Sequence, residues 1–129
     1  MSSLKIVVVD DNEDSCEVLE MYLRGAGHEV ASASTAEAAL ELIDSVHPHL
    51  AIIDISLPVM NGYELASALR AKPERSGIVL VALTGYGRPS DKTAAMDAGF
   101  DEHIVKPLRL EELNTVLDRM VEGRPPEKQ

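Results

Sequence analysis

The sequence predicts a doubly wound α/β domain, a parallel sheet with helices on both of its faces. Two observations lead to this fold class. Short runs rich in Val and Ile alternate with segments of helical periodicity. The most apolar of these runs are nearly continuous, which is typical of strands that are covered on both faces. The chain has 129 residues, which suits one domain of five strand–helix units.

Five strands are expected along the chain. The continuous apolar runs 5–9, 50–53 and 78–83 predict three buried strands, and the weaker runs 29–32 and 103–105 predict two more. If all five run parallel, their carboxyl ends meet at one edge of the sheet, and ligands bind in the crevice outside that edge. The strand pattern therefore predicts where a functional site would lie.

Five helices are expected between and after these strands. Residues 13–24 place Cys16, Leu19 and Leu23 on one apolar stripe, and Cys16 is interpreted as a packed core residue. Ser34 and Glu37 have the spacing of a capping box that opens a helix through about residue 45. The remaining helices are expected at 63–71, 89–98 and 110–121. The domain is assigned to residues 1–122, and 123–129 to a flexible tail or linker stub.

Composition and charge exclude several classes of protein. The chain carries 12 Lys and Arg against 22 Asp and Glu, a formal net charge of −10, so direct contact with nucleic acid is not expected. No apolar run approaches the roughly 18 residues of a membrane span, and no signal peptide is recognisable at the start. A single cysteine fits a reducing compartment, and the expected location is the cytoplasm.

Polar residues stand where four of the apolar runs end. Asp10 and Asp11 follow the first run, Asp54 ends the third, Thr84 follows the fourth and Lys106 follows the fifth. A single acid after a strand is usually a turn or capping residue, but that interpretation does not predict three acids and a lysine at the same edge.

Neighbouring carboxylates repel one another unless cations lie among them. Lys106 supplies one positive charge, and Mg²⁺ fits the remainder because it binds carboxylates, waters and phosphate oxygens. Such a site suits phosphoryl transfer, with an ionised aspartate as the nucleophile that forms an acyl phosphate.

Four stretches resemble bacterial response-regulator receiver domains, with the chemotaxis regulators among the similar proteins. They are Ile-Val-Val-Val-Asp-Asp at 6–11, Asp-Ile-Ser-Leu-Pro-Val-Met-Asn-Gly at 54–62, Ala-Leu-Thr-Gly at 82–85 and Val-Lys-Pro at 105–107. The resemblance runs from about residue 4 to residue 121, and the motifs keep the order and spacing of the family. It implies a flavodoxin-like fold with strand order 2-1-3-4-5.

The resemblance also implies a role for each matching residue. Asp54 would be the phosphorylation site. Mg²⁺ would be bound by Asp54, by Asp11, by the backbone carbonyl of Ser56 and, through water, by Asp10. Lys106 would pair with the phosphoryl oxygens, next to a peptide bond to Pro107 that is usually cis in the family. Thr84 would bond the phosphoryl group and move toward it on activation.

One position departs from the family pattern. His103 stands where relatives have Tyr or Phe, the ring that follows the threonine when the face of helix 4, strand 5 and helix 5 is remodelled. His103 is therefore either a solvated strand-end residue or a switch that depends on pH. Tyr86, two residues beyond Thr84, would lie beside the path of the hydrolytic water.

The resemblance implies protein partners as well. The phosphodonor would be a histidine kinase or a histidine phosphotransfer domain, and an effector would bind the face of helix 4, strand 5 and helix 5. Four residues of the first helix lie off its core stripe and are candidates for contact with the donor, although a broad core-facing stripe is an alternative: Ser15, Val18, Met21 and Tyr22.

Other functions fit the sequence less well. A phosphatase of the haloacid dehalogenase type needs a second acid two residues after its nucleophile, where this chain has Ser56. A flavin carrier needs a phosphate-binding loop after the first strand, where this chain has acids. The expected function is thus a signalling module that catalyses its own phosphorylation and dephosphorylation but is not an enzyme with a released product. It is expected to be either a stand-alone regulator or part of a hybrid histidine kinase.

Overall fold

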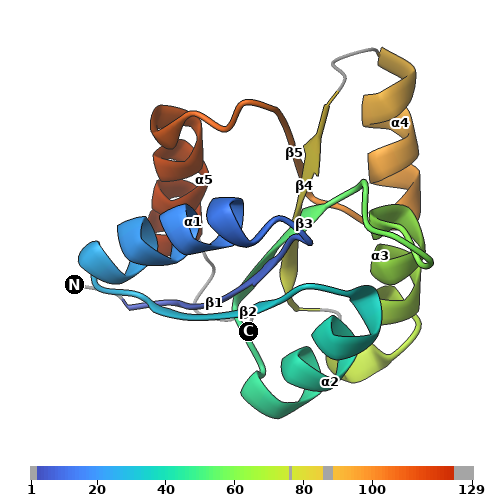
Figure 1. Ribbon diagram of the computed structural model, residues 1–129, viewed down its shortest axis with the longest axis horizontal. Coiled ribbons are helices and arrows are strands. Elements are labelled where there is room, and N and C mark those ends of the chain that lie inside the picture. Colours follow the sequence, from blue (N-terminus) through green and yellow to red (C-terminus); the bar gives the residue numbers. More distant parts are fainter. Residues whose placement is uncertain (1–2, 76, 86–88, 124–129) are drawn as a thin grey trace.

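The computed structural model describes residues 3–75, 77–85 and 89–123. Figure 1 shows a central sheet between two layers of helices. The strands are β1 (Lys5–Val9), β2 (Glu29–Ala33), β3 (Leu50–Asp54), β4 (Val79–Thr84) and β5 (Glu102–Val105). All pairs are parallel, in the order β2-β1-β3-β4-β5. The predicted fold class and strand order are confirmed.

Helices cover both faces of this sheet (Figure 1). They are α1 (Glu13–Gly25), α2 (Ala36–Val46), α3 (Gly62–Arg70), α4 (Pro89–Ala98) and α5 (Leu110–Gly123), with a short 3-10 helix, η1 (Pro73–Arg75). One core cluster joins the sheet to α1 and α5, and a second joins its other face to α2, α3 and α4. No helix of the described chain is long and apolar enough to cross a membrane. Tyr86 and residues 124–129 of the expected tail lie outside the described residues, while Gly123, its first residue, belongs to α5.

The expected elements are present with small shifts at their ends. The largest correction concerns the start of α2, where Thr35 and not Ser34 is the N-cap and accepts the Ala38 N–H at 3.1 Å. Ala36 is buried against the sheet, and this burial sets the rotation of the helix about its axis. The observed N-cap therefore lies one residue after the expected one. A capping box does occur at α3, where Asn61 and Glu64 bond each other's backbone N–H groups.

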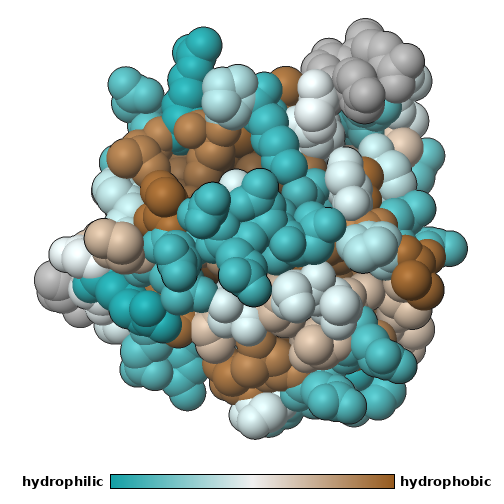
Figure 2. All heavy atoms as spheres, in the orientation of Figure 1, coloured by the Kyte–Doolittle hydropathy of each residue, from teal (hydrophilic) through white to brown (hydrophobic). Residues whose placement is uncertain are grey.

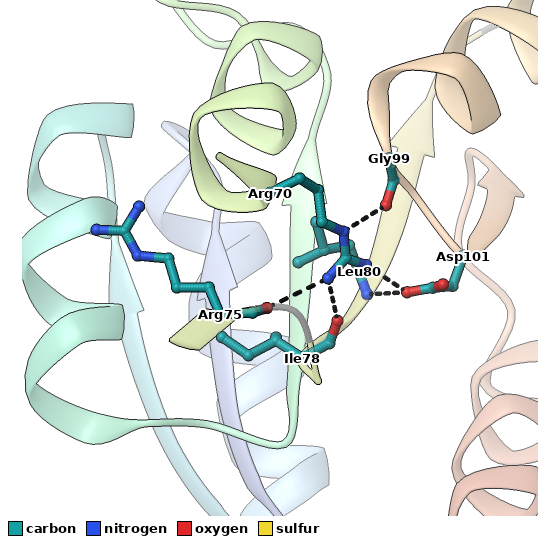
Figure 3. A network of polar contacts seen from close by, with 6 residues as sticks. All are labelled: Arg70, Arg75, Ile78, Leu80, Gly99 and Asp101. Carbon is teal, nitrogen blue, oxygen red and sulfur yellow. Dashed lines mark hydrogen bonds and ion pairs between the residues drawn. The ribbon is translucent and has the colours of Figure 1, made fainter. Parts of the chain in front are cut away.

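A half-buried arginine joins several segments at the edge of the sheet opposite the strand carboxyl ends (Figure 3). Arg70, at the end of α3, donates from Nε to the Gly99 carbonyl at 2.9 Å and from Nη1 to the Ile78 and Arg75 carbonyls at 2.8 and 3.3 Å. Its Nη2 contacts Asp101 Oδ2 at 2.7 Å, and the same oxygen accepts the Leu80 N–H. One side chain thus joins α3, η1, the start of β4 and the turn before β5.

Candidate functional site

Three carboxylates lie together at the carboxyl edge of the sheet. Asp10 and Asp54 are buried, with 2% and 3% of their surface exposed, while Asp11 is exposed. One oxygen from each of the three lies within 4.8 Å of the others. The three carboxylates thus meet at the edge where they were expected, because β1 and β3 are neighbours and end side by side.

Both oxygens of Asp54 have a partner. Oδ1 accepts the Ser56 N–H at 2.9 Å, and Oδ2 accepts from Lys106 Nζ at 2.7 Å. The Lys106 side chain is 38% exposed, while that of Asp54 is 4% exposed. The ammonium group therefore reaches a buried carboxylate from a position that is open to solvent.

Thr84 and Lys106 are joined through the backbone. The Lys106 N–H donates to the Thr84 carbonyl at 2.7 Å, and Thr84 pairs with Val105 in the sheet. Thr84 is buried, with 3% of its surface exposed, and the Lys106–Pro107 peptide bond is cis. The hydroxyl and the ammonium group thus come from adjacent strand ends.

The carboxylates carry more negative charge than the nearby lysine offsets. Burial raises the pKa of Asp10, and the charge of Asp54 raises it further, while the Asn12 N–H and Lys106 act in the opposite direction. Three carboxylates and one ammonium group leave a formal charge of −2 when all are ionised, which favours a cation among them. Oxygen ligands of this kind suit a hard divalent ion, and Asp10, Asp11 and Asp54 could hold one.

Comparison with known proteins decides the family. The profile of the response regulator receiver domain matches residues 6–118. This chain belongs to the response regulator receiver domain family. An uncharacterized 14.6 kDa protein of Leptolyngbya boryana is 32% identical over 98% of this chain and 97% of its own length. Other curated relatives are longer: the chain covers 44% of a probable transcriptional regulator of Cyanophora paradoxa, at 35% identity.

Solved structures agree with this assignment. A putative response regulator from Chloroflexus aurantiacus has a TM-score of 0.86 at 33% identity, with 93% of this chain and 98% of the other covered. The receiver domain of a sensor histidine kinase from Pseudomonas aeruginosa, solved with a magnesium ion coordinated in its active site cleft, has a TM-score of 0.82 at 26% identity, with 92% and 97% covered. The receiver fold is thus shared with both regulators and kinases.

One of the two expectations for His103 was a solvated residue at the end of a strand, and the structure of the receiver domain does not match it. The ring is half-buried, and its Nε2 atom is buried with no hydrogen-bond partner among the described residues. His103 pairs with Ala82, which belongs to the core cluster beneath α2, α3 and α4. Strand alternation places Thr84 toward that same layer. The threonine and the histidine thus lie on one face of neighbouring strands.

The four candidate contact residues of α1 do not form one uniform surface. Ser15 and Val18 line a groove of about 720 Å³ between α1 and the segment that leads from β5 into α5. Val18 and Met21 are 63% and 73% exposed. Tyr22 is half-buried, and its hydroxyl donates to Asn114 Oδ1 of α5 at 2.6 Å. Figure 2 shows apolar surface over α1 and α5, bordered by hydrophilic residues.

Two residues that position the site were missed by the sequence argument. The Asn12 N–H donates to Asp10 Oδ1 at 2.9 Å, while the Asn12 side chain caps α1 by accepting the Ser15 N–H. Gly62 lies so close to β3 that an added Cβ would be 2.7 Å from the Ile55 Cα and 2.9 Å from the Asp54 carbonyl oxygen. An acid followed by Asn two residues later is a weak signal for the first, and only the glycine itself points to the second.

Cys16 is a packed core residue. It is buried, and its Sγ donates to the Asp10 carbonyl at 3.3 Å. Burial and the negative charge of Asp10 raise the pKa of the thiol to about 11. The reactive thiolate is therefore scarce at neutral pH, which argues against a redox role.

Proposed function

We propose that this receiver domain accepts a phosphoryl group on Asp54 from the phosphohistidine of a histidine kinase or a histidine phosphotransfer domain. The observation that carries the proposal is the buried Asp54 carboxylate, which is bonded to Lys106 Nζ at 2.7 Å and lies within 4.8 Å of Asp10 and Asp11. Burial excludes water, and the surrounding charges are those that a phosphoryl group and a divalent cation require.

In the proposed step, an Asp54 carboxylate oxygen attacks phosphorus and forms a P–O bond while the P–N bond of phosphohistidine breaks. The electron pair of the broken bond goes to the imidazole, which takes up a proton. Lys106 Nζ would move from the carboxylate to the transferred phosphoryl oxygens, and the Thr84 hydroxyl would bond another of them. Because the acyl phosphate is later hydrolysed at the same residue, the chain acts as its own catalyst and is not an enzyme that releases a separate product.

We propose Mg²⁺ as the cofactor. Asp11 and Asp54 would hold it directly, together with the Ser56 carbonyl, and Asp10 would bind through water. When bound, the ion supplies positive charge that offsets the phosphoryl oxygens. The related Pseudomonas aeruginosa domain holds magnesium in its active site cleft, which supports the choice of ion. Burial and the charge of Asp54 raise the pKa of Asp10, and a bound cation would favour the ionised form of both carboxylates.

Two protein surfaces follow from the proposal. The donor would contact α1 at Ser15, Val18 and Met21 and fill the groove beside α5, because Asp10 and Lys106, which adjoin Asp54, also line that groove. Tyr22 would contribute mainly by bracing α1 against α5. The effector would bind the face of α4, β5 and α5, which Thr84 and His103 would remodel when Asp54 is phosphorylated.

Intact-mass spectrometry after incubation with acetyl phosphate and Mg²⁺ tests the proposal. The wild type should gain one phosphoryl group, Asp54→Asn should gain none, and removal of Mg²⁺ with EDTA should abolish the adduct. Asp118→Asn, which removes an exposed acid of α5, is the matched control and should react like the wild type. A wild type that shows neither an adduct nor Mg²⁺ binding would contradict the proposed function.

A further inference from the structure

Val59 adopts an unusual backbone conformation and is fully exposed to solvent. Its φ is +66°, in the left-handed region, and its exposed fraction is 105%. A β-branched side chain is strongly disfavoured there because its Cβ substituents crowd the backbone. Full exposure means that no packing within the domain offsets this cost. The free domain thus carries both a strained backbone and an apolar side chain in water.

The segment around Val59 is firmly anchored on both sides. Leu57 is buried, and Met60 packs against the core cluster beneath α2, α3 and α4. The Gly62 N–H donates to the Ile55 carbonyl at 3.0 Å and closes the segment into a loop. The Asn61 capping box then fixes the start of α3. Val59 is therefore presented outward at the tip of a well-fastened loop.

The base of this loop adjoins the phosphoacceptor, since Ile55 directly follows Asp54. Val59 is three residues before Gly62, so an extended chain of ~3.5 Å per residue keeps it within about 11 Å of the loop base. A protein partner of ordinary size covers about 800 Å² on each side, which corresponds to a disc of about 16 Å radius. The contact area of a partner centred on Asp54 is therefore wide enough to include a residue at this distance.

We propose that Val59 is a specificity-determining contact by which the receiver engages the protein that donates its phosphoryl group. The inference rests on the proposed function, because it requires a protein donor that reaches Asp54. The side chain fits an apolar depression on the donor, beside its phosphohistidine. A β-branched side chain on an anchored loop loses little rotamer freedom on binding, so burial of its methyl groups adds directly to affinity.

Two substitutions separate this role from a purely structural one. Val59→Gly relieves the backbone strain and removes the side chain, so it should raise the melting temperature while slowing phosphotransfer from a protein donor. Val59→Thr keeps the β-branch but replaces one methyl group with a hydroxyl group, so it should slow transfer without raising the melting temperature. Val46→Thr makes the same chemical change at the end of α2, near the opposite edge of the sheet, and should leave transfer unchanged.

The donor is chosen first, as the autophosphorylated histidine kinase of the source organism that transfers its phosphoryl group to the wild type fastest. The experiment then measures the rate of phosphotransfer from this kinase to each variant. A contact of this kind predicts a loss of about fivefold or more in the transfer rate of both Val59 variants. Acetyl phosphate needs no protein contact, so both variants should react with it at the wild-type rate. Wild-type transfer from the kinase by both variants would overturn the inference, whereas failure of acetyl phosphate to modify the wild type would overturn the proposed function itself.

Discussion

Replacing Arg70 with Met should destabilise the domain by about 3 kcal/mol. The guanidinium group bonds three backbone carbonyls, those of Gly99, Ile78 and Arg75, and the carboxylate of Asp101 (Figure 3). Each carbonyl bond contributes about 1 kcal/mol net, and the Asp101 side chain is 49% exposed, so its carboxylate returns largely to water. Met fills a similar volume but donates no hydrogen bond.

The melting temperature converts this loss into an observable shift. At ~2.1 cal/mol/K per residue, 129 residues have an unfolding entropy of about 0.27 kcal/mol/K, so a loss of 3 kcal/mol lowers the melting temperature by about 11 °C. Urea unfolding gives the free energy of unfolding independently, from the midpoint and the slope. Because Arg70 lies at the edge opposite Asp54, the folded variant should still react with acetyl phosphate at the wild-type rate.

Arg119→Met is the matched control for this experiment. Arg119 pairs with Glu102 at 3.1 Å, but the two side chains are 60% and 29% exposed, so the pair should contribute no more than about 1 kcal/mol. If Arg70→Met destabilised the domain no more than Arg119→Met does, the reasoning that assigns the fixing of this sheet edge to Arg70 would be refuted.

Three further predictions concern charged and polar side chains. His103→Phe removes the unpartnered Nε2 atom and should raise the free energy of unfolding by about 1 to 2 kcal/mol in urea titrations. A switch that depends on pH through this imidazole predicts that the beryllofluoride-induced NMR shifts of the α4, β5 and α5 face differ between pH 6 and 8. Identical shifts at the two pH values would exclude such a switch. Asp10→Asn removes a buried acid beside Asp54 and should stabilise the domain in EDTA. Adding Mg²⁺ should then raise the melting temperature of the variant less than that of the wild type. An equal rise in both proteins would exclude Asp10 from the cation site. Hydrogen bonds from Arg75 lower the pKa of Asp44 from 3.8, so the stabilisation from this pair is fully present above that value and is lost as the pH falls through the lowered pKa. The difference in urea midpoint between the wild type and Asp44→Asn should therefore shrink below pH 4. A difference that stays constant with pH would contradict a stabilising role for the ionised Asp44.

The sequence predicted the site because the signals for it are local. Each apolar run ends visibly, and the residue after it is read directly, which is how Asp10, Asp54, Thr84 and Lys106 were placed at one edge. The rule that parallel strands end at a common edge then supplied the long-range step. Neither inference required knowledge of how individual side chains pack.

Other features depend on tertiary packing and were not predictable from local patterns. The N-cap of α2 is Thr35 and not the expected Ser34, because the burial of Ala36 fixes the rotation of the helix. The contacts of Arg70 join segments up to 31 residues apart, and no local pattern marks them. Similarly, the positive φ of Val59 and the buried Nε2 of His103 arise where surrounding structure overrides local preference.

Chemical mapping of the phosphorylated residue tests the central claim most directly. Borohydride reduces an acyl phosphate to an alcohol, so treatment of the domain after reaction with acetyl phosphate and Mg²⁺ leaves a permanent mark at the phosphorylated carboxylate. Peptide mass spectrometry should then find the reduced side chain at position 54 and unmodified carboxylates at Asp10 and Asp11. Reduction at another acid, with Asp54 intact, would contradict the assignment of Asp54 as the phosphoacceptor.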